Sequence, residues 1–173
     1  MACVAFGTFG IMREKSGHPQ VQDFLDRGGP IFGAADAASG FLGGYGFVGG
    51  LDDSGGIAPS FLDPARHAQE ASTLTLWADL HSVWAFSYQG LHAEALQQRS
   101  DWFLEPAWPS YVAWWVDDDH MPSWSEAAER YQYLHEYGPT AFAFTFKKPF
   151  DADGGSLTQR DVTTPALTSG AVP

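Results

Sequence analysis

Short runs in which apolar and polar residues alternate predict most of the β-structure of this chain. Four runs predict strands: the first and third show the period of two that is typical of strands, the second is rich in glycine, and the fourth is continuously apolar. They lie at Cys3–Met12, Phe41–Val48, Thr73–Ala78 and Tyr111–Val116. A later alternation of Phe142, Phe144 and Phe146 predicts one further strand near the end of the chain.

Apolar residues that recur at helical spacing predict three helical regions. Gly17–Gly40 has this character but contains glycine and proline in its middle, so we expect a broken helix. Leu80–Phe103 predicts one long helix with an apolar stripe. The third helix is expected to begin at Ser123, which forms a capping box with Glu126, and to end at Gly138.

The order of these elements is that of the split β-α-β, ferredoxin-like plan, followed by an extra helix and strand. It predicts an α+β domain over residues 1–150, with a four-stranded antiparallel sheet and helices on one face. The chain leaves little to cover the other face, so we expect a homodimer in which two sheets form an α/β barrel. Residues 49–72 predict an irregular excursion, and residues 151–173 a disordered or extended tail.

Net charge and cysteine content indicate which partners and which cellular compartment to expect. The 173 residues have a formal net charge of −12, with only nine Lys and Arg residues. Nucleic acids and anionic membranes bind clustered basic residues, so neither is an expected partner. Cys3 is the only cysteine, which fits a reducing compartment. The first residues lack a basic leader and no apolar run reaches the ~20 residues of a membrane span, so we expect a cytoplasmic protein.

Three polar side chains lie on the expected apolar stripe of the long helix and are the candidate catalytic residues. His92 titrates near neutral pH and is a candidate general base; the alternative is a core histidine bonded to a backbone carbonyl. Arg99 keeps its charge and needs an anionic partner, either a substrate or an Asp or Glu of the chain. Tyr88, one turn before His92, either holds a substrate oxygen or packs in the core.

Aromatic residues make up 15% of the chain, which suits a pocket for a flat ligand as well as a heavy core. The residues assigned to substrate binding are Trp77, Trp84, Phe103, Trp115 and His18. His18 precedes Pro19 and is therefore expected in an extended loop, where functional residues often lie.

No metal or organic cofactor is expected from the motifs of the chain. The densest set of possible ligands is Asp117–His120, in which Asp119 and His120 are weak candidates for metal binding. Adjacent aspartates on a strand cannot all point at one ion, so a solvated turn before the third helix is favoured. Phosphate-binding, dinucleotide-binding and nucleophile-elbow motifs are absent.

Four segments carry a resemblance to a known family. They are GTFGIMREKSGHPQVQDF, SYQGLHAEALQQRSDWF, YVAWWVDDDHMPSW and LHEYGPTAFAF. They resemble an uncharacterised bacterial family of the dimeric α/β-barrel superfamily, similar to antibiotic-biosynthesis monooxygenases. The superfamily also contains heme-degrading enzymes, muconolactone-type isomerases and heme dehydratases. The resemblance implies a ligand between the sheet and the helices of one subunit, and makes heme, with His92 as axial ligand, a possible cofactor.

The sequence therefore suggests a small-molecule enzyme of secondary metabolism. We expect acid/base-assisted oxygenation, cyclisation or isomerisation of an aromatic or polyketide-like substrate, with His92 moving the proton and Arg99 stabilising an oxyanion. A heme-dependent protein and a non-catalytic ligand-binding protein remain the two alternatives.

Overall fold

The computed structural model describes residues 1–51, 56–64, 66–67 and 69–165. The strands are β1 Ala2–Ile11, β2 Phe41–Gly49, β3 Glu70–Trp77 and β4 Tyr111–Asp117. The helices are α1 Pro19–Asp36, α2 Leu80–Tyr88, α3 Gly90–Trp102, α4 Trp124–Tyr137 and α5 Gln159–Thr163. All strand pairs are antiparallel, in the order β2-β3-β1-β4, which is consistent with the ferredoxin-like plan. None of the described helices is both long and apolar enough to cross a membrane.

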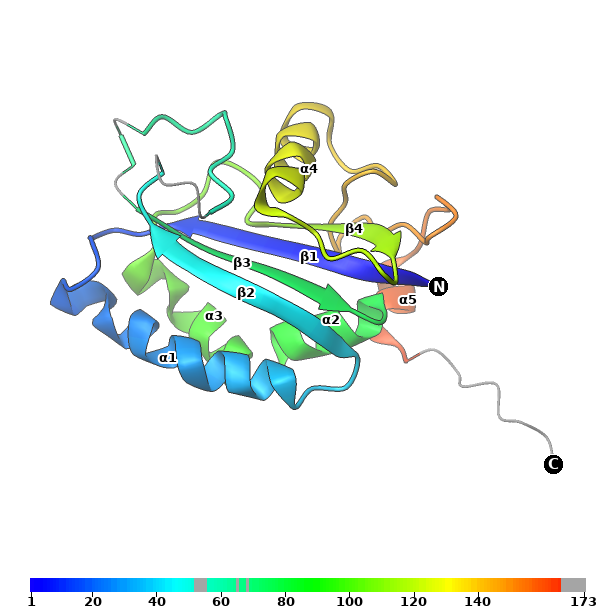
Figure 1. Cartoon of the computed structure of the whole chain (residues 1–173), viewed down its shortest axis with the longest axis horizontal. Helices are drawn as coiled ribbons and strands as arrows, with labels where there is room; N and C mark the ends of the chain where they lie inside the picture. Colours follow the sequence, from blue (N-terminus) through cyan, green and yellow to red (C-terminus); the bar gives the residue numbers. More distant parts are fainter. Residues whose placement is uncertain (52–55, 65, 68, 166–173) are drawn as a thin grey trace.

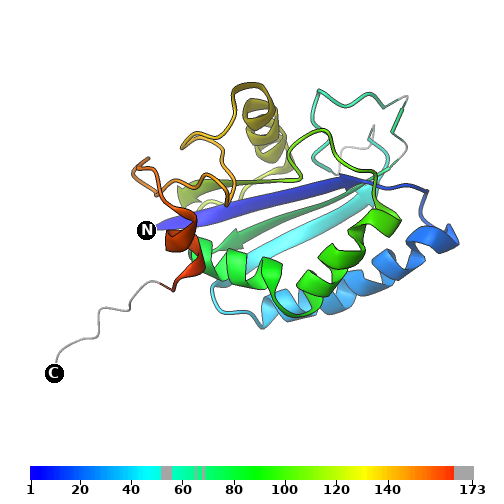
Figure 2. The same cartoon turned by 180° about the vertical axis from the view of Figure 1, so that it is seen from behind.

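Helices α1, α2 and α3 lie together on one face of the sheet (Figures 1 and 2). Val4 and Phe6 of β1 point to this side, because alternate residues of a strand face opposite ways. They pack in one buried cluster with Trp77 of β3 and Val83 of α2. This layer is the one that the sequence predicted.

The opposite face of the sheet is covered within the same chain, by α4 and by the excursion between β2 and β3 (Figure 1). Tyr131 and Leu134 of α4 pack there with Phe9 of β1, together with Ile57 and Leu62 of the excursion. The expected homodimer depended on this face being open. That reason is wrong, because α4 and the excursion bury the face themselves.

Helix α1 is continuous, although a broken helix was expected. It runs through three glycines and Pro30, which lower helix stability because proline lacks a backbone N–H and glycine is flexible. Packing at both ends outweighs this cost. Val21 and Ala35 are buried, and the ring of Phe24 lies 4.8 Å from that of Phe103.

The predicted helix Leu80–Phe103 is two helices, α2 and α3. Gln89 between them is extended, and Gly90 has a φ of 56°. A positive φ does not fit a right-handed helix, and glycine adopts it without a Cβ clash. The break interrupts the single stripe on which the candidate catalytic residues were expected.

Helix α4 begins and ends where the sequence predicts. The Ser123 hydroxyl accepts a hydrogen bond from the Glu126 N–H at 3.2 Å, and Gly138 follows the last turn with a φ of 76°. The Glu126 carboxylate does not accept the hydrogen bond from the Ser123 backbone N–H that would complete the capping box. It accepts instead from the indole N–H of Trp114 in β4 at 2.8 Å, which ties the start of α4 to the sheet.

The region after α4 differs from the expectation in two ways. Phe144 forms a single antiparallel bridge with Ala113 of β4, in place of a strand through Phe142–Phe146. Residues 151–165, expected as part of the disordered or extended tail, include α5, and its Val162 is buried against the α2 side of the sheet. The remaining predicted tail, residues 166–173, lies outside the described residues.

Candidate functional site

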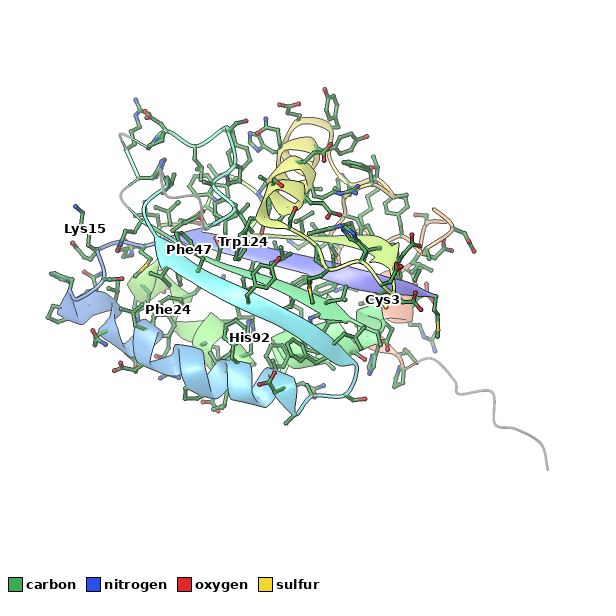
Figure 3. The ribbon with its side chains drawn as sticks, viewed as in Figure 1. Cys3, Lys15, Phe24, Phe47, His92 and Trp124 are labelled. Atoms are coloured by element: carbon green, nitrogen blue, oxygen red, sulfur yellow. The ribbon has the colours of Figure 1, made fainter. Side chains whose placement is uncertain are left out.

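His92 lies near the start of α3, on the helix side of the sheet, opposite to Trp124 of α4 (Figure 3). Its Nδ1–H donates to the Ser87 carbonyl at 2.9 Å, and its ring centroid lies 5.2 Å from that of Phe86. Burial lowers the pKa of His92, and the bond to Ser87 offsets part of the shift. These contacts are those of a neutral core histidine bonded to a backbone carbonyl.

The lowered pKa of His92 leads to a testable pH dependence. Below the ordinary value of 6.5, the unfolded chain binds a proton at His92 that the folded chain still excludes, so stability falls as the pH drops. His92→Asn keeps a donor for Ser87 but does not titrate. We expect the stability of the wild type relative to this variant to fall between pH 8 and pH 5, measured by chemical unfolding. A relative stability that does not change with pH would contradict a buried, neutral His92.

The other two candidate catalytic residues, Tyr88 and Arg99, share a shallow depression. It is lined by Tyr88, Ala93, Leu96, Gln97 and Arg99. Arg99 is exposed, and its Nη1 donates to the Leu96 carbonyl of its own helix at 2.8 Å. Within the described chain, Arg99 has no carboxylate within 4.0 Å. The fold thus brings Tyr88 and Arg99 together but leaves His92 outside the depression.

The packing around His92 gives no support to heme ligation. Phe86 lies against the ring, and Ser87 accepts the Nδ1 proton. The adjoining depression measures about 290 Å³ and does not include His92. Pockets that bury a drug-sized ligand measure ~300–1,000 Å³, so this depression lies below the lower end of that range.

Two of the predicted substrate-binding tryptophans have structural partners instead. Trp77 is buried, and its indole N–H donates to the Thr75 hydroxyl at 2.9 Å. The indole N–H of Trp115 donates to the Phe150 carbonyl at 2.8 Å, which holds the C-terminal region against β4. Both donors are therefore already used.

The remaining predicted substrate-binding residues lie apart from one another. Phe103 packs against Phe24 of α1, and His18 caps α1 by accepting a hydrogen bond from a backbone N–H at 3.2 Å. Trp84 does come near a candidate catalytic residue, with its ring centroid 5.7 Å from that of Tyr88. The sequence-predicted set is therefore dispersed over several elements.

The acidic turn after β4 serves to hold α4. Nε2 of His120 lies 2.7 Å from Oε2 of Glu126. Burial acts to raise the pKa of Glu126, but the hydrogen bonds with His120 and Trp114 outweigh it and lower this pKa. In the part of the chain that the structure describes, no three His, Cys, Asp or Glu side chains are placed to hold a metal. Asp119 and His120 thus gain no further ligands there.

A buried carboxyl that sequence reasoning missed lies at the first residue of β3. Glu70 is 0% exposed and lies on the α4 side of the sheet, beneath residues 56–58. Its Oε2 accepts a hydrogen bond from the Ala58 N–H at 2.9 Å. Among the described residues, Oε1 has no hydrogen-bond partner. Alternate residues of a strand share a face, so Ser72 and Glu70 lie on the same face of β3 as the buried Leu74. This alternation was the feature of the sequence that could have identified Glu70.

Ser72 lies beside Glu70 and is itself buried. Burial raises the pKa of Glu70, and contacts with Ala58, Ser72 and Ile57 offset only part of this rise. Although Ser72 is near enough to act on this pKa, its hydroxyl is not in hydrogen-bond geometry with any described residue. Gly56 covers the carboxyl so closely that any side chain at this position would overlap Glu70 Oε1.

A cluster of aromatic rings lies beside Ser72 on the same face of the sheet. Phe9 is the cross-strand partner of Ser72, and its ring lies 4.8 Å from Tyr131 and 6.0 Å from Trp108. The ring of Phe61 lies 6.4 Å from that of Trp108. The indole N–H of Trp108 is buried and has no partner among the described residues. We call Glu70, Ser72 and Trp108 the buried polar patch.

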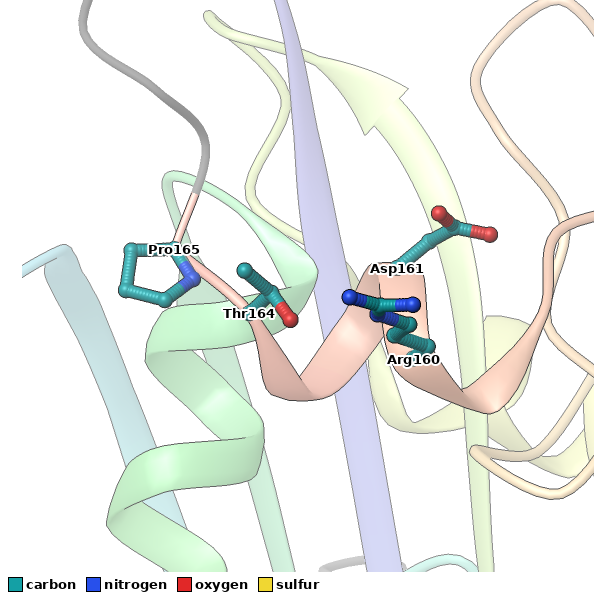
Figure 4. Close-up of a pocket in the computed structure, with 4 residues that line it drawn as sticks. All are labelled: Arg160, Asp161, Thr164 and Pro165. Atoms are coloured by element: carbon teal, nitrogen blue, oxygen red, sulfur yellow. The ribbon is translucent and has the colours of Figure 1, made fainter.

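A second shallow depression lies beside α5. It is lined by Arg160, Asp161, Thr164 and Pro165 (Figure 4). The Asp161 carboxylate accepts hydrogen bonds from the backbone N–H and the hydroxyl of Thr158, both at 2.7 Å. Asp161 therefore caps this five-residue helix. Because its carboxylate already has these partners, the depression is a weaker candidate ligand site than the buried polar patch.

Comparison with known proteins gives a family but no activity. No curated protein matches the chain. The fold is similar to the crystal structure of NE2512, a protein of unknown function from Nitrosomonas europaea. The two share 15% sequence identity over 71% of this chain and 97% of that one, with a TM-score of 0.45. Residues 3–160 match the family described as "Domain of unknown function (DUF3291)", and the chain therefore belongs to that family.

Proposed function

We propose that this protein is a small-molecule enzyme in which Glu70 transfers the proton. The reaction class is the one that the sequence suggested, namely oxygenation, cyclisation or isomerisation of an aromatic or polyketide-like substrate. The observation that carries the proposal is a fully buried carboxyl with one unpartnered oxygen. The proton-transfer role thus moves from His92 to Glu70, and Arg99 and Tyr88 have no part in it.

The energetic cost of Glu70 supports a functional role. A buried polar atom without a partner costs about 1–3 kcal/mol, and Ser72 adds a second such atom beside it. A structural position would be more stable with an apolar or amide side chain. Groups that lower stability in this way are typical of functional sites, where activity sets the residue.

The chemistry of the patch suits proton transfer to or from an organic molecule. Burial raises the pKa of Glu70, and a raised pKa favours the protonated carboxyl, which can donate a proton as a general acid. Phe9, Phe61 and Trp108 supply an apolar aromatic wall for the body of the substrate. Residues 56–58 cover the carboxyl, so a ligand can reach Glu70 only if they move. The resemblance to antibiotic-biosynthesis monooxygenases points to the same class of substrate.

Untargeted mass spectrometry of a small-molecule extract from the source organism, incubated with the protein, tests this function. We expect the wild type to deplete at least one compound. Glu70→Gln should slow that depletion by about 10²–10⁴-fold, the usual contribution of a general acid or base. The matched control is Glu94→Gln, which changes an exposed glutamate of α3 and should leave the rate unchanged.

Two results would count against the proposal. If Glu70→Gln is as active as the wild type while His92→Asn is inactive, the proton is moved at His92. If native mass spectrometry shows a bound compound that is never consumed, the protein is a non-catalytic binding protein.

A further inference from the structure

We infer that Trp108 sets the ligand specificity of the buried polar patch. Its indole N–H would donate to an oxygen of an uncharged aromatic ligand, on the face of the sheet that also holds the carboxyl of Glu70. This inference rests on the proposed function, because it concerns the ligand of the same site. It adds a specificity-determining residue and the charge class of the ligand.

The placement of Trp108 makes its N–H an available donor. The indole stacks on Phe9 with an interplanar angle of 13°, and Phe61 and His67 contact it at ring distances of 6.4 and 5.7 Å. Nε1 is buried but has no partner among the described residues. An indole nitrogen can only donate, and a buried one normally finds an acceptor. A ligand oxygen is the acceptor that the patch lacks.

The acid of the patch is linked to Trp108 through Ser72 and Phe9. Ser72 lies next to Glu70 and is paired across the strands with Phe9, on which Trp108 stacks. The unpartnered atoms are therefore one donor, one hydroxyl and one carboxyl oxygen on the same face of the sheet. A phenol or an enol, which both donates and accepts through one oxygen, matches this set.

The charge at Glu70 disfavours an ionic ligand beside that carboxyl. No Lys, Arg or His among the described residues forms an ion pair with Glu70, so an anionic ligand would meet an acid without a compensating cation. A cationic ligand would have to lose its hydration among Phe9, Phe61 and Trp108, and the buried carboxyl favours its neutral form. An uncharged ligand avoids both costs.

Calorimetric titration with four probes of similar size tests this inference. The probes are naphthalene, 2-naphthol, 2-naphthoate and 2-naphthylmethylammonium at pH 7. We expect 2-naphthol to bind at least tenfold more tightly than either ion. Trp108→Phe keeps an aromatic ring but removes the donor, and should weaken 2-naphthol binding about threefold to tenfold while leaving naphthalene unchanged. Trp84→Phe on α2 is the control and should change neither affinity.

The outcomes separate the inference from the proposed function. Preferred binding of an ion, with turnover still dependent on Glu70, would overturn the charge class and leave the enzyme proposal intact. Equal loss of naphthalene and 2-naphthol in Trp108→Phe would show that the tryptophan only packs. If none of the probes binds and Glu70→Gln also leaves depletion of extract compounds unchanged, both proposals fail.

Discussion

Replacing Tyr131 with alanine is expected to destabilise the protein by about 3–5 kcal/mol, the usual cost of removing a buried aromatic side chain. Tyr131 is fully buried between α4 and the sheet. Its hydroxyl lies 2.9 Å from the Gly7 carbonyl of β1 and 3.1 Å from the Ser110 carbonyl, and can donate to either. The side chain therefore contributes both apolar packing and a hydrogen bond to strand β1. Chemical unfolding followed by circular dichroism measures the change.

Two further variants separate these contributions. Tyr131→Phe keeps the ring but leaves the carbonyls without this donor, and should cost about 1–3 kcal/mol. Tyr137→Ala, on the same helix but with a 69% exposed side chain, should change stability by less than about 0.5 kcal/mol. A loss below 1 kcal/mol for Tyr131→Ala would mean that α4 does not bury this face of the sheet in solution.

Replacing Glu70 with glutamine is expected to stabilise the protein at neutral pH. Because burial raises the pKa of Glu70 above its ordinary 4.5, the folded chain keeps a proton that the unfolded chain has released. The stability of the wild type is therefore full below pH 4.5 and falls as the pH rises from there to the raised pKa. Each unit of that rise corresponds to about 1.4 kcal/mol. Glutamine cannot ionise, so the variant escapes this loss.

Unfolding free energies of the wild type and Glu70→Gln from pH 4 to pH 8 provide the measurement. The advantage of the variant should grow with pH and then level off, while exposed Glu94→Gln should show no such trend. A variant that is more stable yet inactive toward extract compounds would mark Glu70 as a residue retained for function. An advantage that is constant over the whole range would contradict a raised pKa.

Much of the fold follows from local patterns. Alternation and short apolar or Gly-rich runs located all four strands of the sheet to within a few residues, and the helix signals at Ser123 and Gly138 located α4. Local rules failed where packing opposed them. Pro30 lies inside a continuous α1, and Gly90 divides a segment whose apolar spacing fits one helix. Neither outcome is visible without knowing what the neighbouring residues contact.

The site was less predictable than the fold. His92 and Arg99, the polar groups predicted on the apolar face of the helix, each donate a hydrogen bond to a backbone carbonyl of α2 or α3. Glu70 lies in a polar stretch just before the predicted third strand and was taken as part of the excursion. Strand β3 begins at Glu70, three residues earlier than predicted, and the Glu70 side chain is therefore buried in the core.

By itself, the sequence determined the antiparallel α+β plan, the strand positions and the limits of α4, because hydrophobic period and capping act between residues close in the chain. Tertiary structure alone decided that α4 and the excursion cover the second face of the sheet. It also decided that Glu70 lies beneath residues 56–58, and that Ser72 and Trp108 both lie beside Phe9 on the same face of the sheet. Burial and unpartnered polar atoms depend on groups far apart in the chain, and only the folded arrangement brings those groups into contact.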